Sequence, residues 1–431
     1  MLDINVIRRQ ANEFQEAADQ KRIKIDICEL LALDELRREL MQLTESLRAA
    51  RNRRSKVIEG MMREGRKAEA LVEREEAAVQ QEQLKQAEEE YRKVLAEYEA
   101  LILLVPNLMS PDTPIGKSDE DNVEVRRVGA APEFDFAPRS HIELGQQHEM
   151  IDLARGVKIG GTRQYVLRNY GLQLHRAVQQ LALDLLLDKG FEMLDVPVLV
   201  KEQTLVATGY FPANRDQTYA INGEDKWLVG TSEVPLIAYC SDEVIDLTEP
   251  KRLAAVTPCY RSEVGSAGRD AHGLYRVHQF AKVEQVVLCR ADLAESLEWL
   301  EKMTANSEEL LQLLELPYRV VAVCSGDMSQ KNYKQYDIET WMPSRGSYGE
   351  THSASLLLDF QARRSNIKYR DEEGKLQYAY TLNNTMVASP RILIPLLENH
   401  QREDGSIYIP PALRPYMRGL AELQAAVEVK V

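Results

Sequence analysis

An arginine, an aromatic ring and two carboxylates surround a short turn in the middle of this chain. Arg261 and Glu263 stand in residues 260–263, and Phe280 and Glu284 stand in the segment that returns after the turn. Arginine presents a planar fork of donors to phosphate or carboxylate oxygens. A carboxylate accepts an ammonium or a hydroxyl, and Phe280 is suited to cover a purine face. This strand–turn–strand pattern suits a nucleotide triphosphate bound beside an amino acid, although a surface hairpin with ordinary charges explains it equally well.

A second segment, residues 229–235, carries a hydroxyl and a carboxylate two positions apart. Thr231 and Glu233 would face the same side of an extended turn and would suit an α-ammonium group. The alternative is a capped helix start, with Thr231 or Ser232 as the cap and Glu233 in the first turn.

A third segment, residues 348–353, places a carboxylate and a hydroxyl three positions apart. Glu350 and Ser353 would hold Mg²⁺ between ATP phosphates, because magnesium takes a few protein oxygens together with phosphates and waters. A polar strand edge explains the same residues. His352 is not expected to be a general base, because adenylation of a carboxylate needs none.

A fourth segment, residues 381–391, leads into an expected helix over residues 392–401. Thr385 is placed to contact a small polar side chain, and Arg391 is placed to stack on an adenine opposite Phe280. The alternative is a capped helix with a surface arginine. Among all these residues, Arg261 is the one expected to stabilise charge on the α-phosphate in the transition state.

The first hundred residues are expected to form an antiparallel coiled-coil hairpin, with helices over about residues 30–66 and 69–105. Apolar residues recur at alternating spacings of three and four in two runs, and Pro106 ends the second helix. The first run is Leu33, Leu36, Leu40, Leu43 and Leu47, continued by Ala50, Val57 and Met61 and broken by Arg54; the second is Leu84, Ala87, Tyr91, Val94, Tyr98, Leu101 and Val105.

The two helices of this arm carry opposite charge. Residues 48–67 hold eight basic side chains against two acidic ones, and residues 69–99 hold ten acidic against four basic. The charges neutralise each other across the hairpin, or the basic helix meets RNA phosphates near the tip; both hold together without conflict.

The remaining chain is expected to be a linker over residues 106–129 and an α+β domain over residues 130–431. Helical patterns over residues 168–189 and 291–316 alternate with extended runs over 193–200 and 318–323, which predicts an antiparallel sheet with helices on it.

Composition limits the function classes. A length of 431 residues requires two or three domains, and a net charge of −14 argues against DNA or any other nucleic acid coating the whole surface. No apolar run is long enough to span a membrane, and the N-terminus has no signal-like segment. We therefore predict a cytoplasmic protein. The five cysteines have no zinc or disulfide spacing.

The four segments together resemble the seryl-tRNA synthetases, a class II aminoacyl-tRNA synthetase family. Residues 260–284 are similar to motif 2 of that family and residues 190–197 to motif 1, and the resemblance covers nearly the whole chain. It implies a homodimer with an antiparallel catalytic sheet and a coiled-coil arm that contacts tRNA(Ser). It also implies activation of L-serine by ATP and transfer of the seryl group to tRNA(Ser).

The resemblance implies a role for each matching residue. Arg261, Glu350 and Arg391 are the catalytic residues, and Glu350 and Ser353 hold Mg²⁺. The expected serine contacts are Thr231, Ser232, Glu233, Arg261, Glu284, Asn383 and Thr385, and the expected ATP contacts are Arg261, Ser262, Glu263, Phe280, Glu350, Thr351, His352, Ser353 and Arg391.

Three departures from the family pattern concern the pocket walls. Gly230 stands where the family commonly has proline, residues 354–358 replace a Cys/Asn-containing stretch, and Asn384 replaces a glycine. They suggest a divergent paralogue. Two alternatives remain: a ligase that passes the amino acid to a carrier protein, which the full arm disfavours, and an inactive RNA-binding relative, which Arg261 and Glu350 disfavour.

Overall fold

The protein forms two compact units. The computed structural model describes residues 1–264 and 272–424, and the chain divides into Met1–Pro106 and Asn107–Val431. Most of the turn expected between the two motif 2 strands, residues 265–271, lies outside the described residues. The segment expected as a linker differs from that expectation, because residues from 107 onward belong to the second unit and Val123–Val128 (β1) is a strand of its sheet.

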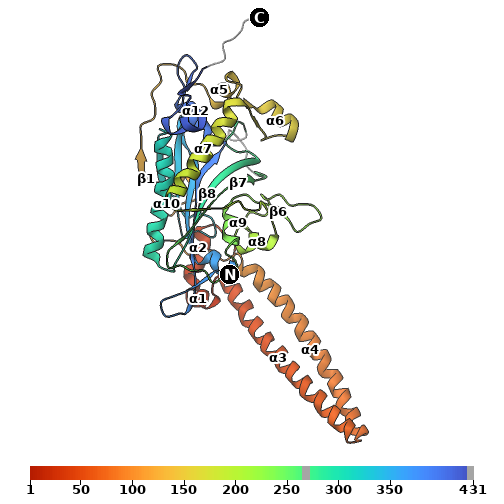
Figure 1. Ribbon diagram of the computed structural model, residues 1–431. Coiled ribbons are helices and arrows are strands. Elements are labelled where there is room, and N and C mark those ends of the chain that lie inside the picture. The colour runs from red at the N-terminus through yellow and green to blue at the C-terminus, as the bar shows by residue number, and fades with distance from the viewer. Residues whose placement is uncertain (265–271, 425–431) are drawn as a thin grey trace. The chain divides into compact units, whose positions relative to one another are not determined.

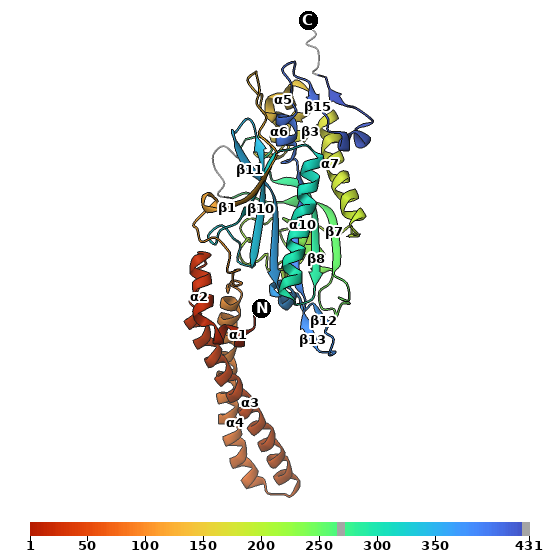
Figure 2. The ribbon, with the colours of Figure 1, turned by 90° about the vertical axis from the view of Figure 1, so that its left-hand side faces the viewer.

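The first unit is helical and contains the predicted hairpin. Two short helices, α1 (Ile4–Arg9) and α2 (Ala11–Gln20), precede the long helices α3 (Ile27–Arg63) and α4 (Lys67–Ile102). Figures 1 and 2 show α3 and α4 side by side along their length. The Asp26 carboxylate caps α3 by accepting from the Cys28 and Glu29 amides, and Gly65 turns the chain at a φ of +79°.

The seam between the long helices is only partly the predicted one. The run from Leu84 to Val105 is confirmed, because most of its members are buried. On α3, however, Leu36, Leu43 and Val57 are 38%, 46% and 47% exposed. Polar residues take the seam positions beside them, namely Asp34, Thr44 and Arg54. The apolar pattern was wrong at Leu36, Leu43 and Val57. Asp34 and Thr44 are buried instead, Asp34 in ion pairs with arginines and Thr44 with its hydroxyl donating to the Met41 carbonyl. Arg54, which was expected to break the run, is half-buried and pairs with Glu73 at 3.3 Å and Glu76 at 2.9 Å.

Asp34 is the charged centre of the base of this hairpin. Its side chain is 1% exposed and accepts from Arg8, from Arg37 at 2.7 Å and from Arg38 at 3.3 Å. Burial alone would raise the pKa of Asp34, but hydrogen bonds from Arg37 and Arg8 outweigh it and lower the pKa below its usual value.

Asp34→Ala is therefore expected to destabilise the base of the hairpin by about 3 kcal/mol, because three arginines lose a buried partner. Hydrogen exchange of peptides covering Ile27–Arg63 measures this loss. The contribution of Asp34 to the free energy of unfolding is fully present above the ordinary carboxyl pKa of about 3.9. It is lost as the pH falls through the lower pKa that Asp34 has in the folded state. Glu59→Ala is the control, since its pair with Arg63 is exposed; equal protection in both variants would contradict the role of Asp34.

The second unit is built on an eight-stranded sheet in the order β1-β9-β10-β11-β14-β8-β7-β4. All neighbours pair antiparallel except β4 and β7. The other strands are β4 (Glu192–Met193), β7 (Lys251–Tyr260), β8 (Gln279–Cys289), β9 (Tyr318–Ala322), β10 (Lys334–Met342), β11 (Ser347–Leu358) and β14 (Tyr380–Ser389). The predicted α+β class and antiparallel sheet are confirmed.

Two long helices cover one face of the sheet. Figures 1 and 2 show α7 (Asn169–Asp188) and α10 (Leu293–Leu313) lying across β8, β14 and their neighbours, as the two helical patterns predicted. Their apolar sides bury the main core, with Leu174, Val178 and Leu310 packed against strand residues such as Val287 and Leu382. Over the described residues, none of the helices combines the length and apolarity that crossing a membrane requires.

The opposite face of the sheet carries shorter helices and the polar residues of interest. The helices α8 (Glu202–Ala207), α9 (Glu233–Ala238) and α11 (Phe360–Ser365) pack there, and Leu236 and Ala362 join a second core cluster. Because side chains alternate along a strand, Asn384 of β14 points toward α10 while Asn383 and Thr385 line a pocket on the other face.

Candidate active site

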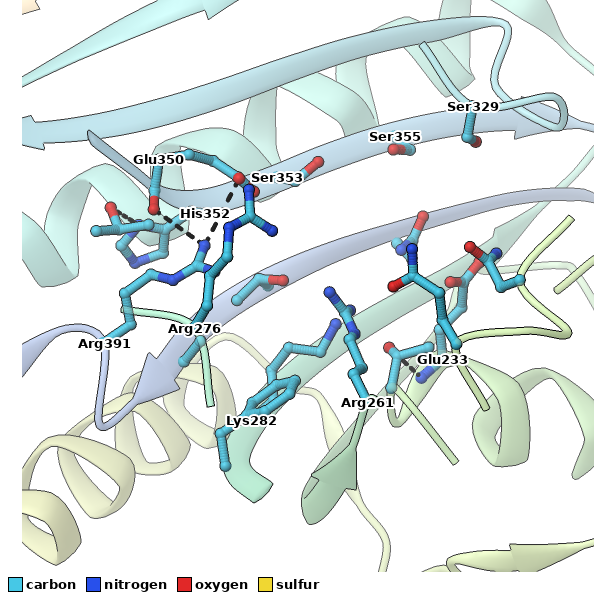
Figure 3. Close-up of a pocket in the computed structure, with 18 of the residues that line it drawn as sticks. Glu233, Arg261, Arg276, Lys282, Ser329, Glu350, His352, Ser353, Ser355 and Arg391 are labelled. Carbon is cyan, nitrogen blue, oxygen red and sulfur yellow. Dashed lines mark hydrogen bonds and ion pairs between the residues drawn. The ribbon is translucent and has the colours of Figure 1, made fainter. Parts of the chain in front are cut away.

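A single pocket collects most of the residues predicted from the sequence. Its lining includes twelve of them: Thr231, Glu233, Arg261, Glu263, Phe280, Glu350, Thr351, His352, Ser353, Asn383, Thr385 and Arg391. They come from the end of β7 and from β8, β11 and β14, with the start of α9 at one side. Figure 3 shows Arg261 reaching up from the end of β7, with Glu233 on one side and Glu350, Ser353 and Arg391 on the other.

Arg261 is fixed by two contacts at the centre of the pocket. Its Nε donates to the Gly230 carbonyl at 3.2 Å, and its guanidinium lies 5.3 Å from the centre of the Phe280 ring. One nitrogen is thus used for positioning, and the planar head stays directed into the pocket (Figure 3). A guanidinium held this way costs little reorganisation when negative charge develops next to it.

Arg391 and Glu350 form the opposite end of the pocket. The Arg391 guanidinium donates to the carbonyls of Tyr275 and Glu350 at 3.0 and 3.1 Å and lies 3.6 Å from the Glu350 carboxylate. It also stacks on the Tyr275 ring at 4.4 Å. In the structure Arg391 lies over Tyr275, and Phe280 is covered by Arg261.

Several carboxyl groups lie close together at the Glu350 end. Burial, followed by the Glu350 carboxylate, holds the pKa of Asp337 well above its usual range, and burial with the Asp119 and Glu350 carboxylates raises that of Asp327. Ser353 accepts from Gln335 at 3.1 Å in the same region. Hard oxygen donors in a negative site are what Mg²⁺ requires. The described residues contain no cluster of three or more metal-ligating side chains, so a magnesium ion here would depend on phosphate oxygens for its remaining ligands.

The Glu233 end combines a carboxylate with two donors from elsewhere in the chain. The Glu233 Oε1 accepts from the Lys331 ammonium and from Gln361 Nε2, the latter at 2.7 Å. Gln361 is held in turn by Thr208 and Thr381. The Thr231 hydroxyl accepts from the backbone amide of Glu233 at 3.2 Å at the start of α9. Thr231 and Glu233 also line the pocket, so the two interpretations of this segment, a helix start and a ligand-facing turn, are compatible.

Glu284 is fully buried and does not line the pocket itself, but its partners do. Its carboxylate accepts from Lys282 at 2.7 Å, from Asn383 at 3.2 Å and from Thr385 at 3.5 Å. Lys282, Asn383 and Thr385 all line the pocket. A hydroxyl that entered between Thr385 and Asn383 would therefore meet an ordered set of polar groups.

Two predicted site residues point away from the pocket. Ser232 is fully buried, and its hydroxyl bonds to that of Thr257 at 2.7 Å. Ser262 donates to the Asp216 carbonyl at 3.1 Å. Neither side chain lines the pocket in this structure, and Ser232 has helical backbone angles at the start of α9.

His352 is placed in the pocket wall as a neutral ring. It is 1% exposed, and its Nδ1 lies 2.8 Å from the Thr351 hydroxyl, which in turn bonds to that of Thr340. Burial lowers the pKa of His352 to about 3. A ring with that pKa is uncharged at neutral pH and is a weak base.

The structure adds six charged or aromatic residues to the predicted site. The pocket is also lined by Tyr210, Tyr275, Arg276, Lys282, Asp327 and Lys331. Lys282 has a sequence signal, since it stands two positions before Glu284 and therefore on the same face of β8. Lys331 has none, because it comes from the irregular segment between β9 and β10.

The departures from the family pattern affect the pocket less than expected. Asn384 lies in the extended backbone of β14 and donates to Met303 O at 2.6 Å and Ser307 Oγ at 3.0 Å on α10. Ala354, Leu356 and Leu357 are buried in the interior. A glycine-only backbone angle at position 384 is thus not the reason for that difference. Two of the departures do meet the pocket: Ser355 lines it, and the Gly230 carbonyl holds Arg261.

Gly230→Ala is expected to destabilise the protein by about 1–3 kcal/mol, because an added methyl group overpacks the site. A Cβ at this position would stand 2.1 Å from the Tyr210 hydroxyl, and Tyr210 is itself 8% exposed. Thermal unfolding measures the loss, and Tyr210→Phe in the same chain is expected to recover part of it. Gly60→Ala, which meets no atom within 4 Å, is the control; equal stability of both alanine variants would refute the contact.

Comparison with known proteins identifies relatives over the full length. Residues 217–400 match the family model of the tRNA synthetase class II core domain (G, H, P, S and T), and residues 1–109 match the seryl-tRNA synthetase N-terminal domain. The serine–tRNA ligase of Deinococcus radiodurans is 44% identical over 420 residues, which cover 97% of this chain and 98% of the relative. That of Caldanaerobacter subterraneus subsp. tengcongensis is 44% identical over 421 residues, with coverage of 97% and 98%.

Solved structures agree with these sequence matches. The seryl-tRNA synthetase of Pyrococcus horikoshii complexed with ATP superposes with a TM-score of 0.88 at 34% identity, covering 99% of this chain and 100% of that one. The cytoplasmic serine–tRNA ligase of Naegleria fowleri in complex with AMP gives a TM-score of 0.83 at 26% identity, covering 99% of each chain. The resemblance predicted from the sequence is confirmed, and this chain belongs to the seryl-tRNA synthetase family of class II aminoacyl-tRNA synthetases.

Proposed function

We propose that this protein is a serine–tRNA ligase, which activates L-serine with ATP and transfers it to tRNA(Ser). The main support for the proposal is that Arg261 lies between two ends of one pocket that are lined by different kinds of side chain. The Glu233 end offers carboxylates and hydroxyls for a small amino acid. The Glu350 end offers an arginine, a stacked aromatic ring and clustered carboxylates for a nucleotide with its metal.

In the first step the serine carboxylate attacks the α-phosphorus of ATP and pyrophosphate leaves. Arg261 bridges the carboxylate and the α-phosphate, so its positive charge opposes the charge that builds up in the transition state. Glu233 and Thr231 bind the α-ammonium, and Glu284, Asn383 and Thr385 bind the side-chain hydroxyl. Alanine leaves those polar groups without a partner and is rejected strongly, whereas threonine must be excluded by shape.

ATP binds at the Glu350 end. Arg391 and Phe280 cover the adenine, and Glu263 accepts from its amino group. Glu350 and Ser353 would hold Mg²⁺, which would supply positive charge to the phosphates. The relative from Pyrococcus horikoshii is complexed with ATP, which supports ATP as the nucleotide.

In the second step a terminal hydroxyl of tRNA(Ser) attacks the carbonyl carbon of seryl-adenylate, the acyl–phosphate bond breaks, and AMP leaves. The arm of α3 and α4 binds the RNA. Part of the basic charge on α3 is neutralised within the hairpin, as in the pair of Arg48 with Glu88 at 2.8 Å. Arg53 and Lys56 are exposed and form no ion pair with the described residues, so they remain available to phosphates.

Arg53→Glu/Lys56→Glu is therefore expected to raise the KM for tRNA(Ser) by about tenfold and to flatten its salt dependence, since two phosphate contacts are lost. Steady-state aminoacylation at several salt concentrations measures both effects. The KM for serine in pyrophosphate exchange serves as the control, because that reaction needs no tRNA. An unchanged KM for tRNA(Ser) would remove these two residues from the RNA-binding surface.

The working form is a homodimer in the cytoplasm. The motif 1 segment contains β4, the edge strand of the sheet, and the nearby Leu187 and Leu199 side chains are 59% and 46% exposed. Covering such side chains in a partner interface is favourable. Sedimentation equilibrium tests the dimer. The Naegleria fowleri relative carries the cytoplasmic label that we predict here.

ATP–pyrophosphate exchange with serine, threonine, alanine and no amino acid tests the activation step. Exchange that depends strongly on serine is the expected result, followed by charging of tRNA(Ser). Exchange with serine but no charging of any tRNA would favour a ligase with another acceptor. Folded protein that exchanges with none of the amino acids would overturn the proposal.

A further inference from the structure

The carboxylate that would bind the amino acid already has an internal cation. The Lys331 ammonium pairs with Glu233 Oε1 inside the pocket, where the two side chains are 14% and 4% exposed. Gln361 donates to the same oxygen at 2.7 Å. Glu233 therefore already has an internal cation and an amide donor as partners.

Lys331 differs in placement from the second lysine of the pocket. Lys282 is fixed in β8, two positions from Glu284, and its ammonium pairs with that carboxylate. Lys331 lies in the segment between β9 and β10, outside regular structure, and reaches Glu233 from a distant part of the sequence. A lysine carries a compact charge on a flexible four-carbon stem, so Lys331 is able to withdraw without moving a strand.

We propose that Lys331 is a specificity-determining residue that competes with the α-ammonium of the amino acid for Glu233. The inference rests on the proposed function, in which the α-ammonium of serine also binds Glu233. Two ammonium groups at one carboxylate repel each other in a partly desolvated site, so serine binds only as Lys331 moves off. Lys331 therefore raises the KM for the amino acid. It also reduces the difference in affinity between the amino acid and an analogue that lacks the amine.

The inference makes a directional prediction. Lys331→Met removes the competitor while Gln361 still holds Glu233, and the KM for serine in pyrophosphate exchange is expected to fall on the order of tenfold. The inhibition constant of 3-hydroxypropionate, which is serine without its amino group, is expected to stay nearly constant. The preference for serine over this analogue therefore rises by about the same factor as the KM falls.

Two further variants separate competition from other effects. Lys331→Arg keeps a cation at Glu233 and is expected to retain the wild-type KM and the wild-type preference. Lys334→Met is the matched control, because Lys334 is three positions away and pairs with Asp112 instead of a pocket residue. Lys331→Gln replaces Lys331→Met if the apolar variant does not fold by circular dichroism.

The outcomes distinguish this inference from the proposed function. Serine-dependent exchange with an equal or higher KM in the Lys331→Met variant would overturn the competition and leave the ligase activity standing. Absence of exchange in the wild type and in every variant would overturn both. Exchange in the Lys331→Met variant with a lower KM, together with a wild-type KM in the Lys331→Arg variant, supports the inference.

Discussion

Arg261→Met is expected to lower kcat for serine-dependent pyrophosphate exchange by about 10²–10³-fold, the usual cost of removing one fixed donor that faces developing charge. The structure supports a large effect because Arg261 is held from both sides, by the Gly230 carbonyl and the Phe280 ring. Arg261→Lys keeps the charge but loses the planar fork, so it is expected to recover only a small part of the activity. Pre-steady-state adenylate formation measures the chemical step directly.

A second arginine in the same sheet provides the control for this experiment. Arg319 lies over the Tyr348 ring at 5.2 Å, much as Arg261 lies over Phe280 at 5.3 Å, but it pairs with Glu339 away from the pocket. Arg319→Met should leave kcat within twofold of the wild type, by our estimate for a partly exposed pair. If Arg261→Met reduced kcat by less than tenfold, the central role of Arg261 would be wrong.

Glu284→Gln is expected to reduce kcat/KM for serine by about 10–10²-fold and to narrow the gap between serine and alanine. Hydrogen bonds to a charged acceptor contribute about 1.5–3 kcal/mol, which the neutral amide largely loses. The substitution keeps the shape of the side chain, and it leaves the Lys282 ammonium, which is 2.7 Å from the carboxylate, without its counter-charge. Exchange rates with serine and alanine, measured in parallel, give the change in discrimination.

Glu339→Gln is the corresponding control for the carboxylate. Glu339 is also on a strand of the sheet and also accepts from a cation, Arg319 at 2.6 Å, but it does not line the pocket. It is expected to leave the serine-to-alanine ratio unchanged. A Glu284→Gln variant that kept the wild-type ratio would show that the hydroxyl is recognised elsewhere, with Thr385 and Asn383 as the remaining candidates.

The order of the chemical segments and the class of the fold were evident in the sequence. The strand–turn–strand around Arg261, the two long covering helices and the helical hairpin all follow from local periodicity. Most side chains of the site were also predictable, because the four segments keep their functional types at fixed spacings. The errors were local: Ser232 and Ser262 were assigned to the pocket, and their hydroxyls bond elsewhere.

The seam of the hairpin shows a limit of apolar patterns. Leu36 and Leu43 were assigned to the interface, yet Asp34 and Thr44 are buried there and the leucines are exposed. Only partners from α1 and from α3 itself make burial of Asp34 favourable, since arginines from both satisfy the carboxylate. A pattern that counts hydrophobic residues in one helix contains no information about such partners.

The sequence by itself determined which residue types take part in the chemistry, because each motif is short and local. Only the tertiary structure decided how they are paired. It brought Lys331 to Glu233 and Gln361 to the same carboxylate, across 98 and 128 positions of the chain. It also placed the Arg391 guanidinium over the Tyr275 ring. These contacts depend on which strands are neighbours in the sheet and on the side to which each side chain projects, and neither is encoded within one segment.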